Sequence, residues 1–229
     1  MLVRLLDEHG SIVPPMAFIP AAERYNMMSA IDEWVIRHAF SAITARGRNA
    51  GTYAINVSGT SIADDRFREF VREQFRQHVM PPRSVCFEIT ETAAIANFDK
   101  ASRFFGEMKS LGCLFSLDDF GAGMSSFGYL KHLPVDFIKI DGSFVTNVAD
   151  DPVDRATVQA INDVGHVMGK RTIAEFVSGA SGLETLRQIG VDFAQGDWLS
   201  PARPFVFGEK RSENPRSAAL EPESAVQAA

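Results

Sequence analysis

The sequence contains few cysteines and no long apolar segment. Of its 229 residues only Cys86 and Cys113 are cysteines, and both lie in apolar runs. Because a disulfide framework needs more cysteines in a shorter chain, we expect two buried free thiols in a reducing cytoplasm. No apolar run approaches the roughly 20 residues of a transmembrane helix, and the charged first residues do not resemble a signal peptide. These absences predict a cytoplasmic chain without a membrane segment.

Excess positive charge and a glycine-rich dinucleotide loop are also missing. The chain has 23 lysines and arginines against 29 acidic residues, a formal net charge of −6. Proteins that bind the phosphate backbone of a nucleic acid polymer need a basic face, so such a partner is not expected. A small anionic ligand is still compatible with this charge, because a bound metal ion supplies positive charge. No G-x-G-x-x-G turn follows a first strand, which argues against a dinucleotide-binding sheet.

What the chain does contain is an alternation of short apolar runs with longer amphipathic stretches. The apolar runs, typical of strands buried on both faces, are residues 53–57, 85–89, 114–117, 137–140, 172–174 and 191–194. Apolar residues at helical spacing predict helices at residues 31–45, 64–78, 98–110, 154–168 and 181–189. Repeated strand–helix units predict an α/β fold with a parallel sheet, either doubly wound or closed into a barrel.

The two ends of the chain depart from this alternation. Residues 2–6 have the pattern of a strand that begins abruptly and has no earlier strand to pair with, which is unusual for a complete barrel. Residues 208–229 are polar and alanine-rich without apolar periodicity, so we expect a disordered tail. The prediction is one barrel domain over residues 1–207, and its length suits a small barrel of about 200 residues.

Polar residues stand at or just past the C-terminal ends of all six predicted strands. They are Asn56, Glu88, the pair Asp118 and Asp119, Lys139, Glu175 and Gln195. Unpaired charge in a core is costly, and in a parallel barrel these ends converge on one rim, where barrel enzymes place their active sites. Asn56 and the carboxylates form an all-oxygen set, which Mg²⁺ and Mn²⁺ prefer. The pattern therefore indicates a metal site at the rim.

The neighbouring carboxylates of Asp118 and Asp119 pose a geometric problem. Successive strand residues point to opposite faces, so we expect Gly121 and Gly123 to let the backbone turn and bring both carboxylates to the site. A metal ion would relieve their mutual repulsion. Taken singly, the positions also have ordinary interpretations: Asn56 as a turn residue, Glu88 and Glu91 as solvated carboxylates, Asp119 as a loop cap, and Lys139 as a surface partner of Asp141.

One long stretch resembles a known family. Residues 118–144, DDFGAGMSSFGYLKHLPVDFIKIDGSF, closely resemble the hallmark loop and strand of EAL-domain cyclic di-GMP phosphodiesterases. Further matching segments, in the family's order and spacing, are FIPAAERY (18–25), IDEWVI (31–36), INVSG (55–59), FEITET (87–92), IAEFV (173–177) and QGDWLSPARP (195–204). The resemblance extends from Met1 to about Pro204 and implies a TIM-like (β/α) barrel of the EAL type.

The resemblance also implies an activity, the metal-dependent hydrolysis of cyclic di-GMP to linear pGpG in bacterial signalling. Two ions, Mg²⁺ or Mn²⁺, separated by about 3.5–4 Å would position the attacking water and neutralise phosphoryl charge. Their implied ligands are Asn56, Glu88, Asp118 and Asp119. Lys139 and Glu175 are implied to orient and activate the water, and Gln195 to lie near metal and substrate. Asp141 is implied to bind substrate, Arg4 to bind its phosphate, and Glu91 to anchor the DFGAG loop. A homodimer and an upstream cyclase or sensor domain are the implied partners.

The chain departs from the family pattern at its start. Met1 falls on the first x of the E-x-L-x-R motif, so the metal-binding glutamate and the strand before it would precede Met1. We therefore expect a barrel that lacks its first strand and a chain whose turnover is weakened or abolished. Ser178 also stands where the family often has a second glutamate.

Two alternative functions follow from these departures. A catalytically inactive receptor would keep Arg4 and the nucleotide pocket but would not hydrolyse the ligand. A different metal-dependent barrel, such as an enolase-like enzyme, would also carry carboxylates on successive strands, although the DFGAGMSSFGYLK stretch argues against it.

Overall fold

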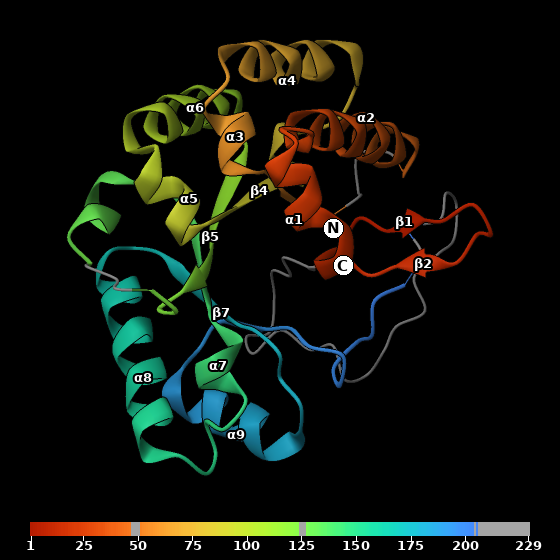
Figure 1. Cartoon of the computed structure of the whole chain (residues 1–229). Helices are drawn as coiled ribbons and strands as arrows, with labels where there is room; N and C mark the ends of the chain where they lie inside the picture. Colours follow the sequence, from red (N-terminus) through yellow and green to blue (C-terminus); the bar gives the residue numbers. More distant parts are fainter. Residues whose placement is uncertain (47–50, 124–126, 204, 206–229) are drawn as a thin grey trace.

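Six parallel strands form a curled sheet with helices on its outside (Figure 1). The structure is a computed structural model and describes residues 1–46, 51–123, 127–203 and 205. The strands lie side by side in chain order: β3 (Tyr53–Asn56), β4 (Val85–Thr90), β5 (Leu114–Phe120), β6 (Phe137–Ile140), β7 (Arg171–Ala174) and β8 (Phe193–Ala194). The predicted α/β fold and all six predicted strands are confirmed. The predicted disordered tail lies outside the described residues.

The five predicted long helices are confirmed with ends shifted by a few residues. They are α2 (Met28–Arg46), α4 (Asp65–Gln77), α6 (Phe98–Leu111), α8 (Pro152–Val167) and α9 (Ala180–Ile189). Helix α6 ends at Gly112, whose φ of 104° is the left-handed conformation that glycine adopts readily at a helix C-terminus. Among the described helices none is both long and apolar enough to cross a bilayer.

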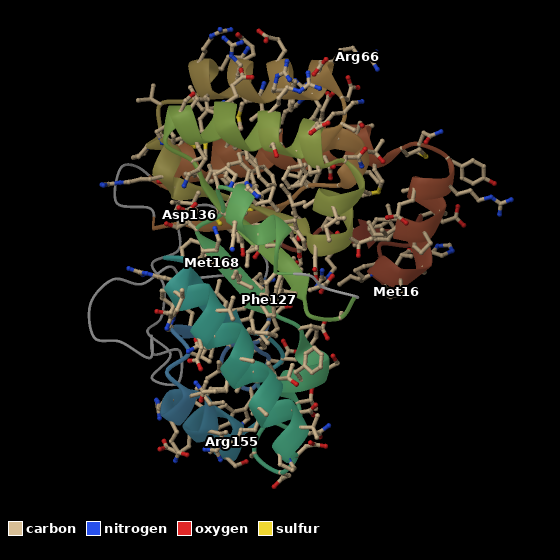
Figure 2. The ribbon with its side chains drawn as sticks, turned by 90° about the vertical axis from the view of Figure 1, so that its left-hand side faces the viewer. Met16, Arg66, Phe127, Asp136, Arg155 and Met168 are labelled. Atoms are coloured by element: carbon tan, nitrogen blue, oxygen red, sulfur yellow. The ribbon has the colours of Figure 1, made fainter. Side chains whose placement is uncertain are left out.

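Several short elements were not predicted. Helix α1 (Pro15–Arg24) projects from the body of the molecule with Met16 exposed on it (Figure 2). Short helices follow three strands: α3 (Gly59–Ile62), α5 (Glu91–Ala96) and α7 (Gly142–Val145). Two 3₁₀ turns, η1 (Pro82–Ser84) and η2 (Tyr129–His132), precede β4 and β6. These five elements of three to six residues leave too few apolar repeats for a periodic pattern to be recognised.

The prediction of a barrel strand at residues 2–6 is wrong. Only Leu5–Leu6 (β1) is extended, and it pairs antiparallel with Ile12–Val13 (β2) in a separate two-stranded sheet. The turn between them is closed locally, because the carboxylate of Asp7 accepts hydrogen bonds from the backbone amides of His9 and Ser11, and Gly10 has a φ of 78°. The hairpin is therefore specified by its own turn and remains largely exposed.

Phenylalanines fill the space between the sheet and helix α6. The ring of Phe104 lies 5.7 Å from that of Phe87 on β4 and 6.0 Å from that of Phe115 on β5, centroid to centroid and in edge-on geometry. Such aromatic contacts contribute about 0.5–1.5 kcal/mol each beyond the burial of area. Cys86 and Cys113 are both buried and free, as predicted.

A buried carboxylate on α2 holds the chain just after β3. One oxygen of Asp32 accepts hydrogen bonds from the backbone amide of Ser58 at 2.9 Å and from the hydroxyl of Ser61 at 2.6 Å. Burial raises the pKa of Asp32, and the hydrogen bonds from Ser61 and Ser58 oppose this only in part. This carboxylate links helix α2 to the turn that follows Asn56.

We expect Asp32→Ala to lower the free energy of unfolding by about 1–3 kcal/mol, because two buried donors lose their acceptor. Asp32→Asn keeps an acceptor oxygen and should cost less. Urea unfolding measures both changes. Glu33→Ala is the control, since it removes only a partly exposed pair with Arg37, worth at most about 1 kcal/mol. Equal losses for the Asp32 and Glu33 alanine variants would contradict the assigned role.

Candidate active site

The inner face of the sheet has an apolar layer below a polar one. Strand residues alternate between faces, so each apolar residue that points inward is followed two positions later by a rim residue. The apolar layer is a buried cluster of Cys86, Phe137, Ile173 and Phe193. The polar residues two positions further along the same strands are Glu88, Lys139, Glu175 and Gln195. Strand alternation thus brings together the charged side chains that the sequence placed at strand ends.

Lys139 lies at the centre of this rim. Its side chain is 5% exposed, and Nζ lies 2.7 Å from Asp118 Oδ1, 2.7 Å from Glu175 Oε1 and 3.3 Å from Glu88 Oε1. Burial acts to lower the pKa of Lys139, but the three carboxylates outweigh it and the pKa is raised. Lys139 is therefore a permanent cation, and the alternative of a surface pair with Asp141 is wrong.

A bulge in β5 brings Asp118 and Asp119 to the same site. The register between β5 and β6 shifts between Leu117 and Phe120, and Asp119 has a φ of 54°. A bulge suspends the usual alternation of side chains, so the two carboxylates need not diverge. Gly121 has the predicted positive φ, 98°, whereas no positive φ is found at Gly123. The turn expected at the two glycines thus begins two residues earlier, at Asp119.

Glu175 directly follows β7, and its two oxygens have different surroundings. Oε1 accepts from Lys139 and, at 2.9 Å, from the side-chain amide of Gln195. Oε2 is buried and has no hydrogen-bond partner among the described residues. Burial raises the pKa of Glu175 to about 7; the charge of Lys139 lowers it, while that of Asp118 adds to the rise. A carboxylate held in this way is suited to accept a proton near neutral pH.

Glu91 joins the DFGAG loop to the end of β4. Oε2 accepts the backbone N–H of Gly121 at 3.2 Å, and Oε1 accepts the hydroxyl of Tyr129. Glu91 is buried, so its interpretation as a solvated carboxylate is wrong. Tyr129 was not predicted from the sequence, because nothing in its spacing marks a tyrosine as a hydrogen-bond donor to a distant carboxylate.

The remaining predicted residues are less closely tied to the cluster. Asn56 donates its side-chain amide to the carbonyl of Met1 at 3.3 Å. Asp141 caps helix α7 by accepting from the backbone amide of Ser143 at 2.9 Å. Arg4 is exposed and donates to the carbonyl of Val3. No hydrogen bond or ion pair joins Arg4 to the carboxylate cluster within the described chain.

The residues present fit a divalent cation. One oxygen from each of Asp118, Asp119 and Glu175 lies within 4.8 Å of the others, and all are hard oxygen donors of the kind that Mg²⁺ and Mn²⁺ prefer. Burial and the charges of Asp118 and Asp141 raise the pKa of Asp119, and a nearby cation would oppose this by favouring the ionised carboxylate.

Comparison with known proteins decides the family, since the family model of the EAL domain matches residues 1–202. The chain belongs to the EAL-domain family. It is 41% identical over 208 residues to cyclic di-GMP phosphodiesterase PdeB of Shewanella oneidensis, a match that covers 90% of this chain and 24% of PdeB. This EAL domain therefore spans about a quarter of the length of that relative.

Solved structures confirm the TIM-like fold of this EAL domain. The PaMucR phosphodiesterase in complex with c-di-GMP has a TM-score of 0.80 and 30% identity, with 86% of this chain and 81% of that chain covered. The FimX EAL domain of Pseudomonas aeruginosa, bound to c-di-GMP, has a TM-score of 0.81 and 30% identity, covering 90% and 84%. The curled six-stranded sheet described above is thus the EAL-type barrel architecture.

Proposed function

We propose that this EAL domain binds cyclic di-GMP and hydrolyses one of its phosphodiester bonds to give linear pGpG, with Mg²⁺ or Mn²⁺ bound at the rim. The observation that carries the proposal is the convergence of Asp118, Asp119 and Glu175 beside the buried ammonium of Lys139. Relatives named as cyclic di-GMP phosphodiesterases and a neighbour bound to c-di-GMP support it.

The charge of the rim supports a metal-dependent reaction. The ammonium of Lys139 lies among the carboxylates of Glu88, Asp118, Asp119 and Glu175, and the rim keeps an excess of negative charge even with the nearby amino group of Met1. A phosphodiester is itself an anion and would be repelled from such a rim. Asp118 and Asp119 would hold the ion, with Glu88 and Asn56 as further ligands. A divalent ion bound there supplies charge to the phosphoryl oxygens and acidifies the attacking water.

Proton transfer, charge stabilisation and ligand binding are assigned to separate residues of the chain. Lys139 and Gln195 both hold Oε1 of Glu175, which fixes the carboxylate and leaves Oε2 to accept the proton of the attacking water. Lys139 adds fixed positive charge for the oxygen on which negative charge develops. Arg4 offers a planar fork of donors for a phosphate, and Asp141 is proposed to contact the ligand from the start of α7. Glu91 keeps the DFGAG loop in place through Gly121.

The direct test is incubation of the purified chain with cyclic di-GMP and either Mn²⁺ or Mg²⁺, followed by chromatography of the nucleotides. We expect pGpG to form at a measurable rate, in keeping with the weakened turnover expected from the sequence. EDTA should stop the reaction, and Asp118→Asn should abolish it. Binding of cyclic di-GMP without turnover by the metal-loaded protein would instead assign a receptor. No binding at all would overturn the proposal. A homodimer and an attached cyclase or sensor domain remain predictions of the resemblance, and a cytoplasmic location remains a prediction from the few cysteines and the lack of long apolar runs.

A further inference from the structure

Phe176 combines an unfavourable backbone conformation with an exposed aromatic ring. It has a φ of 52°, and its side chain is 67% exposed. Bulky L-residues rarely adopt positive φ, because Cβ crowds the following carbonyl. An exposed phenylalanine also leaves apolar area in water. Both features are unfavourable for folding, and residues held in such conformations concentrate at ligand sites.

Two glycines make room for Phe176 on either side. A Cβ atom added at Gly142 would overlap the ring of Phe176, and one added at Gly196 would overlap the backbone of Val177. The amide of Val177 also donates to the carbonyl of Gln195 at 3.0 Å. The chain after β7 is therefore held between the ends of β6 and β8 with the ring fixed against α7, so Phe176 is not a flexible surface side chain.

The ring of Phe176 lies next to residues of the rim. Phe176 directly follows Glu175, and Gly142, against which its ring packs, directly follows Asp141. The other exposed aromatic side chains of the described residues, Tyr25 and Trp34, are at α1 and α2. Phe176 thus places a flat apolar surface beside a rim that is otherwise charged.

We propose that the exposed face of Phe176 stacks on one guanine base of cyclic di-GMP. The inference rests on the proposed function and extends it, because a bound metal ion and the ammonium of Lys139 attract the phosphates but offer no flat surface on which a base can stack. A purine has a flat π-face that an exposed aromatic ring matches, and a fixed ring loses little conformational entropy on binding. Glu175, which accepts the proton of the attacking water, and Phe176, which stacks on a base, would then be adjacent residues of one turn.

Steady-state kinetics with cyclic di-GMP and Mn²⁺ test the proposal. Phe176→Ala should raise KM by about 5- to 150-fold, the equivalent of 1–3 kcal/mol per stacked base at 1.4 kcal/mol per tenfold, with kcat changed much less. Phe176→Leu keeps apolar area without a π-face and should recover only part of the loss, whereas Phe176→Trp should recover most of it. Tyr25→Ala is the matched control, since Tyr25 is 69% exposed, and should leave KM unchanged.

Fluorescence gives a second readout that does not depend on turnover. Stacking on guanine should quench the indole of Phe176→Trp when cyclic di-GMP is added, beyond any change in the wild-type tryptophans. Wild-type binding with an unchanged KM in Phe176→Ala overturns the stacking proposal alone. Absence of cyclic di-GMP binding by the wild type overturns this proposal together with the proposed function. A ring needed only for self-association, shown by a lower sedimentation coefficient of Phe176→Ala at unchanged KM, also overturns it.

Discussion

Replacement of Glu175 by glutamine is expected to lower kcat for cyclic di-GMP by about 10²- to 10⁴-fold, the usual contribution of a positioned general base. Glutamine preserves the shape of the side chain but cannot accept a proton at Oε2. It also removes one carboxylate from the group formed with Asp118 and Asp119. Metal affinity, measured by titration calorimetry with Mn²⁺, separates the two effects, because a lost base lowers kcat even at saturating metal.

The pH dependence of kcat should also identify Glu175 as the general base. The pKa of Glu175 is raised to about 7, and the base form is the ionised one, so kcat should rise with pH until this carboxylate is deprotonated. A bound divalent ion favours ionisation, which places the midpoint of the acidic limb at or below about 7. Glu175→Gln should lose this limb. If kcat of that variant still rose with pH over the same range, another group would be the base. Glu184→Gln, on the exposed side of α9, is the control and should show the pH dependence of the wild type.

Replacement of Lys139 by methionine is expected to lower the free energy of unfolding by about 3–5 kcal/mol, the cost of breaking a buried ion pair by removing one partner. Methionine fills a similar volume but leaves the carboxylates of Glu88, Asp118 and Glu175 facing one another without the ammonium. The same change should make the rim bind a divalent ion more tightly. Urea unfolding with and without Mn²⁺ should therefore show a larger metal-dependent gain in the variant than in the wild type.

Lys170 provides the matched control for this experiment. It is also buried, but its ammonium donates to the backbone carbonyls of Leu133 at 3.0 Å and Val135 at 3.1 Å. Lys170→Met should destabilise the fold by leaving those carbonyls unpaired, with no change in the response to Mn²⁺. If Mn²⁺ raised the free energy of unfolding equally in both methionine variants, the ion would not be binding at the carboxylates that Lys139 neutralises.

The sequence predicted the sheet and its long helices because their signals are local and repeated. Each strand is a short apolar run, and each long helix, such as α4 with Phe67 and Val71 inward, shows its apolar face over several turns. The hairpin of β1 and β2 was misread, since an apolar run alone does not say which strand it will pair with. Helices α3, α5 and α7 have only four to six residues and show no periodic apolar face.

The members of the candidate site were predictable, but their geometry was not. Strand-end placement alone identified Lys139 and Glu175, because a charged side chain buried at the edge of a parallel sheet is costly unless it is paired or coordinates a metal. The bulge at Asp119 depends on register between β5 and β6, a non-local property. The hydroxyl of Tyr129 reaches Glu91 across 38 positions of sequence, and no local pattern reports such a contact. The assigned roles of Asn56, Arg4 and Asp141 remain predictions.

The two-layer interior of the sheet also bears on how such a domain can change over evolution. Cys86, Phe137, Ile173 and Phe193 pack on one another, whereas the catalytic candidates stand two positions later on the same strands. Because the lower layer is apolar and separate, loss of a single rim carboxylate need not disturb the packing that holds the strands together. Gene duplication followed by such a loss would leave a folded domain without the proposed metal site.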